Sequence, residues 1–149
     1  MKILANDGIS QSGIEALINA GFEVITTKVA QEQVANFINE HDVVVLLVRS
    51  ATKVVIDACP SLKIIGRGGV GMDNIDVDYA KEKGIAVINT PASSSASVAE
   101  LVFAHLFSGV RFLHDANRNM PLEGDSNFNG LKKAYAAGIE LRGKTIGIV

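Results

Sequence analysis

The feature that most constrains this fold is an alternation, from residue 3 to residue 88, of short apolar runs with amphipathic stretches. The runs have strand length, and the stretches carry apolar residues at helical spacing, with Gly21 and Gly84 where helix C-caps belong. Because parallel strands need crossover connections, the alternation predicts an α/β fold with a flavodoxin-like open parallel sheet of order 2-1-3-4-5 and helices on both faces. The expected strands are Ile3–Ala5, Phe22–Ile25, Val43–Val48, Leu62–Ile65 and Ala86–Ile88, and the expected helices are Ser10–Asn19, Gln31–Glu40, Lys53–Ala58 and Val77–Lys83.

The pattern changes after Pro91. Val98–Leu113 predicts a long, mostly apolar helix that needs cover on most sides, preceded by hydroxyl residues suited to capping. Asn117–Gly138 is polar and rich in Gly, Asn and Lys, which predicts a poorly ordered surface connection. Lys144–Val149 predicts the opening of a buried strand. We therefore expect one domain over residues 1–96 and an incomplete second domain over residues 97–149.

Composition narrows the partners. The chain has 14 Lys and Arg against 16 Asp and Glu, so its charge indicates no general affinity for nucleic acid or an anionic membrane. Its longest apolar run, Val43–Val48, is too short to span a bilayer. Cys59 is the only cysteine, so no intrachain disulfide can form. We expect a cytoplasmic protein that binds small molecules or protein and has no metal site.

A glycine motif follows the fourth expected strand. Gly66–Gly71 satisfies the G-x-G-x-x-G pattern of dinucleotide-binding loops. In those loops the helix opens within the motif, whereas here Met72–Asp76 intervenes and would bring two acids near the phosphates. Asn89 and Thr90 also stand where a ribose-binding acid is expected. The sequence therefore argues against a pyrophosphate loop here.

The same loop suits a smaller anion. Glycines let bare backbone N–H groups approach a ligand, and Arg67 adds positive charge, although the glycines could equally serve a tight turn alone. Arg49 and Ser50 follow the third expected strand. Ligands of open α/β sheets bind outside the carboxyl ends of the strands, so Arg49 and Arg67 should face one crevice. Two guanidinium groups and a hydroxyl there predict a carboxylate or phosphate site.

Five segments together resemble the D-2-hydroxyacid dehydrogenases in order and spacing, with the 3-phosphoglycerate branch fitting best. The resemblance implies that the chain is the N-terminal portion of an NAD-dependent oxidoreductase, one that oxidises D-3-phosphoglycerate to 3-phosphohydroxypyruvate in serine biosynthesis and forms a homo-oligomer. It also implies a substrate domain followed by a crossover helix and the first strand of a truncated Rossmann domain. The segments are Val48–Thr52, Ile65–Asp76, Asn89–Pro91, Ser97–Glu100 and Leu141–Val149.

The resemblance also assigns residues. Val70 matches a position on the nicotinamide side in some members. The family's catalytic Arg, Glu and His would lie beyond Val149, because none of the three histidines here matches the catalytic position, so this fragment alone should be inactive. Ser94 and Ala51 depart from an Asn and an Arg found in some members, which weakens the implied phosphate contacts relative to the carboxylate contacts. The residues matching substrate-binding positions are Arg49, Ser50, Arg67, Gly68, Gly69 and Gly71.

Other functions fit less well. A stand-alone module that binds a small anion without catalysis would use the same arginines but no NAD. A phosphoacceptor receiver needs an acid after the third strand and a Lys after the fifth, where this chain has Arg49 and Asn89. A flavin carrier needs aromatic groups to stack on its ring, and the chain has two Tyr and no Trp. The dehydrogenase hypothesis is therefore favoured, with the anion-binding module as the alternative.

Overall fold

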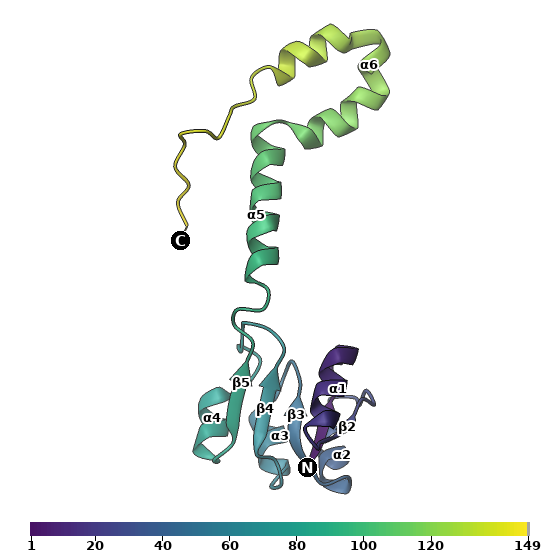
Figure 1. Cartoon of the computed structure of the whole chain (residues 1–149), viewed down its shortest axis with the longest axis vertical. Coiled ribbons are helices and arrows are strands. Elements are labelled where there is room, and N and C mark those ends of the chain that lie inside the picture. Colours follow the sequence, from purple (N-terminus) through teal and green to yellow (C-terminus); the bar gives the residue numbers. More distant parts are fainter. Residues whose placement is uncertain (149) are drawn as a thin grey trace. The chain divides into compact units, whose positions relative to one another are not determined.

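The computed structural model describes residues 1–148, and the chain forms two compact units, Met1–Ser94 and Ser95–Val149 (Figure 1). The first unit contains strands and helices in alternation, and the second is helical. The strands are β1 (Lys2–Ala5), β2 (Glu23–Ile25), β3 (Val43–Leu47), β4 (Ile64–Arg67) and β5 (Ala86–Asn89). The helices are α1 (Gln11–Asn19), α2 (Val34–Glu40), α3 (Lys53–Ala58), α4 (Val77–Glu82), α5 (Ser95–Val110) and α6 (Leu113–Tyr135).

The five strands of the first unit form one parallel sheet in the order β2-β1-β3-β4-β5. This confirms the predicted flavodoxin-like order, with β1 in register between β2 and β3 at Ile3, which pairs with Val24 and Val45. All the strands run the same way, so their carboxyl ends lie along one edge of the sheet. That edge is where the loops carrying Arg49 and Arg67 emerge.

The core of the first unit lies where α2, α3 and α4 pack on the sheet. Leu4, Leu46 and Ile65 are completely buried in the three central strands. They belong to one apolar cluster with Ile38 of α2 and Val55 of α3. Burial of this apolar area is the main source of stability for the unit and fixes the strand ends that carry the site.

Two element boundaries differ from those predicted. Leu62 is buried but lies in the turn before β4, which begins at Ile64 and runs to Arg67. Helix α2 begins at Val34, because Gln31–Gln33 form a turn closed by a backbone bond from the Gln33 N–H to the Ala30 carbonyl. In both cases hydrophobic pattern identified a buried segment but not where its regular hydrogen bonding starts.

The second unit corrects the predicted surface connection. Residues 117–135 of that segment are helical, within α6, with a bend at Asn127. The helix is held by contacts inside the unit: the Asn119 side chain donates to the Tyr135 hydroxyl at 3.0 Å, and the Tyr135 ring stacks on Phe112 with centroids 6.1 Å apart. Leu131 is buried. The prediction failed because a mostly exposed helix shows little apolar periodicity in its sequence.

Two further expectations concern α5 and the last residues. Helix α5 is long, as predicted, although it begins at Ser95, and many of its apolar side chains are exposed within the described chain. Residues 144–148 form no strand, which contradicts the prediction for them, and Val149 lies outside the described residues. A strand needs a neighbouring backbone for its hydrogen bonds, and Ile148 is 92% exposed.

The described helices were also compared with the length and composition of a membrane span. No single one is long and apolar enough to cross a bilayer. Helices α5 and α6, which are bent by 52° relative to each other, meet that test only when they are joined.

Candidate functional site

A crevice follows the carboxyl ends of the strands in the first unit. It consists of adjoining cavities that share lining residues and that lie after β1, β3 and β4. The central cavity, of about 180 Å³, is lined by both Arg49 and Arg67. The structure thus places on one cavity the two arginines that the sequence predicts to share a crevice. The other residues of its lining are Asp7, Gly8, Leu47, Val48 and Gly68.

Arg49 is positioned by the end of β1. Its backbone N–H donates to the Asp7 carboxylate, which joins the loop after β3 to the loop after β1. The Arg49 side chain is exposed, and no ion pair to it is found among the described residues. The backbone contact therefore fixes the position of Arg49 while its guanidinium remains available to a ligand.

The glycine loop after β4 is held by β5. The Asn89 side chain donates to the Val70 carbonyl at 2.8 Å, and the Thr90 N–H donates to the Gly69 carbonyl at 3.1 Å. Arg67 folds back on the loop, and its Nη1 donates to the Gly68 carbonyl at 2.6 Å. The loop is thus built from hydrogen bonds on its carbonyl side, which turns its amide groups to other partners.

Amide groups of this loop are available for a ligand. Within the described residues, the N–H groups of Gly68, Val70 and Gly71 have no hydrogen-bond acceptor in the protein. Gly68 lines the central cavity beside Arg67, so one of these donors lies next to a guanidinium. Backbone donors beside a cation are the combination that binds a carboxylate or phosphate.

The same loop does not have the geometry of a pyrophosphate site. Helix α4 begins at Val77, after the turn and bridge formed by Met72–Asp76. Ala51 and Ile75 pair in an isolated parallel bridge inside this stretch. The helix N-terminus therefore does not open within the glycines, as phosphate binding by a dinucleotide loop requires. The residues of this chain do not fit the pyrophosphate of NAD here.

Not every predicted residue lies on the crevice lining. Ser50 is half-buried at one side, where its carbonyl accepts from the Gln31 side chain at 3.5 Å. Gly69, Val70 and Gly71 lie on the outer part of the loop, and Val70 is 53% exposed. They remain candidates for contact with a ligand or cofactor that enters from outside the crevice.

The sequence analysis missed one side of the crevice. Asp7 and Gly8 line the central cavity because they follow β1, just as Arg49 follows β3. The rule that ligands bind at the carboxyl ends of strands applies equally to all the strands. Applied to Asn6–Gly8, it would have identified these residues.

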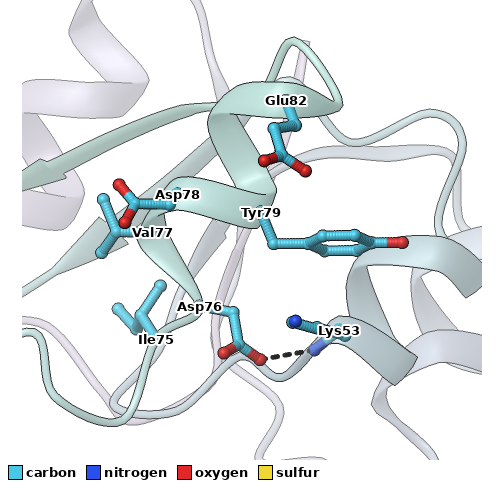
Figure 2. A pocket seen from close by; sticks show the side chains of 7 residues that line it. All are labelled: Lys53, Ile75, Asp76, Val77, Asp78, Tyr79 and Glu82. Carbon is cyan, nitrogen blue, oxygen red and sulfur yellow. Dashed lines mark hydrogen bonds between the residues drawn. The ribbon is translucent and has the colours of Figure 1, made fainter.

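A second polar cavity, of about 400 Å³, lies at the start of α3 and α4 (Figure 2). Figure 2 shows Tyr79 extending from α4 toward Lys53, whose backbone N–H donates to the Asp76 carboxylate at 2.8 Å. The carboxylates of Asp78 and Glu82 also line this cavity. Three carboxylates against one lysine disfavour an anion, so the crevice with two arginines is the better anion site.

Beside this cavity, Asp57 joins α3 to α4. Its carboxylate accepts from the Tyr79 hydroxyl at 2.8 Å and pairs with Lys83 at 2.8 Å. The hydrogen bond from Lys83, with that from Tyr79, lowers the pKa of Asp57, and the same contact raises the pKa of Lys83. The ammonium groups of Lys53 and Lys83 each lie 5.1 Å from the Tyr79 ring centre. This cluster connects two helices on the protein surface.

Cys59 is the remaining group with reactive potential. Its side chain is 1% exposed, and burial raises the pKa of its thiol. A raised pKa keeps the thiol protonated and unreactive, so Cys59 is a packing residue.

Comparison with known proteins places this crevice in a family. The model of the D-isomer specific 2-hydroxyacid dehydrogenase catalytic domain matches residues 3–138. D-3-phosphoglycerate dehydrogenase of Methanocaldococcus jannaschii is 40% identical, with 100% of this chain and 28% of the relative aligned. Hydroxypyruvate reductase of Thermotoga maritima is also 40% identical, over 99% of this chain and 47% of the relative.

A solved structure agrees with these sequence relatives. The NAD+-bound 3-phosphoglycerate dehydrogenase of Entamoeba histolytica superposes with a TM-score of 0.61 and 31% identity, covering 74% of this chain and 39% of its own. Fold and crevice thus define a parallel α/β domain with a basic site at the carboxyl ends of its strands. The chain belongs to the D-isomer specific 2-hydroxyacid dehydrogenase family, which confirms the resemblance found in its sequence. It spans from about a quarter to about half the length of these relatives.

Proposed function

We propose that this chain is the N-terminal portion of an NAD-dependent D-2-hydroxyacid dehydrogenase that oxidises D-3-phosphoglycerate. The observation that carries the proposal is the presence of Arg49 and Arg67 on one cavity at the carboxyl ends of the strands. The relatives named D-3-phosphoglycerate dehydrogenase and the NAD+-bound structure support the substrate and the cofactor. In this proposal the crevice holds the substrate while the hydride is transferred.

The residues of this chain have binding roles in the proposal. Arg67 and the amide of Gly68 bind the substrate carboxylate, with Gly69 and Gly71 shaping the loop around it. Arg49 and Ser50 contact the substrate from the adjacent loop. Val70, exposed on the outside of the glycine loop, faces the nicotinamide side. Fixing the carboxylate orients the hydroxyl carbon for hydride transfer, which is the contribution that positioning makes to rate.

The proposal assigns the chemistry itself to residues outside this chain. NAD supplies the hydride acceptor when it is bound, and the glycine loop here does not fit its pyrophosphate, so the cofactor is held elsewhere. The catalytic Arg, Glu and His are likewise expected beyond Val149. We further propose that the parent protein works in the cytoplasm as a homo-oligomer and that this fragment alone is inactive.

The test is to read the coding sequence past the codon for Val149 and to assay its full product. We expect a glycine loop that opens directly into a helix, and reduction of NAD+ in the presence of D-3-phosphoglycerate. Arg67→Gln should lower kcat/KM about 30- to 100-fold, because a charged hydrogen bond to the carboxylate is lost.

A matched control accompanies this variant. Lys63 is exposed at the amino end of β4, away from the crevice, so Lys63→Gln should leave kcat/KM unchanged. A stop codon directly after Val149, or full turnover by Arg67→Gln, would contradict the proposal. The stop codon would leave a module that binds a small anion without catalysis.

A further inference from the structure

A third cavity extends the crevice past Arg49. It has a volume of about 390 Å³ and shares Asp7, Gly8 and Arg49 with the central cavity. On its far side it is lined by residues that follow β2 and have no role in the function proposed above. Those residues are Thr26 and Lys28.

The segment that carries Lys28 is fixed to the end of β1. The Asn6 side chain is buried, and its Oδ1 accepts from the Val29 N–H at 2.8 Å. Val29 itself is buried in the core cluster. A buried amide that binds the residue next to Lys28 holds the backbone of this loop in place, so the start of the Lys28 side chain is fixed beside the cavity.

The charges that line this cavity favour an anion. Lys28 and Arg49 supply two positive charges, and Asp7 is the one acid in the lining. The Asp7 carboxylate is already engaged by the Arg49 backbone N–H. Lys28 has no ion pair among the residues that the structure describes. A lysine ammonium and a neighbouring hydroxyl suit a compact, highly charged group such as a phosphate.

We propose that Lys28, with Thr26 and Arg49, forms a second anion subsite, so that the crevice selects small ligands with two anionic groups. This inference rests on the proposed function and names its specificity: the carboxylate lies at Arg67 and Gly68, and a phosphate lies at Lys28. Arg49 lines both cavities and contacts the space between the two groups. Lys28 thereby distinguishes a phosphorylated hydroxy acid from the same acid without phosphate.

Two ligands that differ only in the phosphate test this subsite. D-Glycerate, D-3-phosphoglycerate and inorganic phosphate are titrated into the isotope-labelled chain, and dissociation constants are measured from NMR shifts. Lys28→Gln should weaken binding of D-3-phosphoglycerate about two- to fivefold, the size expected for one exposed charge pair, and leave D-glycerate unchanged. Lys28→Arg should retain most of the phosphate preference, and Lys63→Gln should change neither constant.

The outcomes separate the subsite from the proposed function. Equal loss for both acids, or no loss for either, overturns the subsite while leaving the hydroxy acid site in place. If inorganic phosphate shifts the Lys28 signals but neither acid binds, the subsite stands and the proposed function fails. If no ligand shifts the signals of Lys28 or of the glycine loop, both are wrong.

Discussion

The two units of this chain use apolar residues in opposite ways. In the first unit Leu4, Leu46 and Ile65 are fully buried by the helices of the same unit. In the second unit α5 is at least as apolar, yet Leu101 is 58% and Phe103 50% exposed. The first unit thus satisfies its own hydrophobic surface, and the second does not within the described residues.

The comparison teaches what a hydrophobic pattern specifies. In the first unit, period-two strands and amphipathic helices specify both the element and its partner, because each element is covered by its neighbours in sequence. A helix that is apolar on most sides specifies only that it needs cover. What covers α5 is not encoded in the helix itself.

The largest expected effect sharpens this comparison with one substitution made in each unit. Leu46→Ala in β3 should lower the free energy of unfolding by about 2–5 kcal/mol, because it leaves a cavity in a closed core. Leu101→Ala in α5 should change it by less than about 1 kcal/mol, because the side chain is already exposed. Urea unfolding followed by circular dichroism gives both values.

The pair also defines its own contradiction. Similar losses for the two variants would mean that α5 is buried in solution, and the contrast between the units would disappear. Val54, which is 77% exposed on α3, provides a control inside the first unit. Val54→Ala should behave like Leu101→Ala if exposure, and not the unit, decides the effect.

A smaller effect is expected from the surface cluster that joins α3 and α4. The hydrogen bonds from Lys83 and Tyr79 hold the pKa of Asp57 below its ordinary value of 3.8. The folded state therefore prefers the ionised carboxylate, and its stabilisation is present above pH 3.8 and is lost as the pH falls through the lowered pKa. Asp57→Asn should lower the Tm modestly at neutral pH, and the difference from the unmodified chain should vanish in acid.

The other ion pair of the first unit serves as the control. Asp78 and Lys81 are 4.0 Å apart and both are largely exposed. Asp78→Asn should leave the Tm unchanged at every pH, because such surface pairs contribute little. A Tm difference for Asp57→Asn that persists at low pH would show that the aspartate acts by packing and not by charge.

Much of the first unit could be predicted from its sequence. The strand order followed from the β-α alternation, and Arg49 and Arg67 were brought to one edge by the rule for parallel sheets. Strand ends were less accurate, because Leu62 is buried without being in a strand. Lys28 escaped notice because it follows β2 after Thr26 and Thr27, and no motif marks it.

The second unit was predicted less well, for a physical reason. Pro121 and Gly124 indicate a loop by propensity, yet both lie inside α6. Contacts that are distant in sequence, such as Asn119 with Tyr135, hold that helix. Local sequence cannot reveal such contacts, and tertiary packing overrides the propensity.

The central claim is that the crevice at Arg49 and Arg67 binds the carboxylate of a hydroxy acid. Its most direct test is to titrate the isotope-labelled chain with D-glycerate and to follow the amide signals by NMR. We predict shifts concentrated at Gly68–Gly71 and Arg49 that are lost in Arg67→Gln. No shift at these residues, or shifts at the cavity of Figure 2 around Tyr79, would contradict the claim.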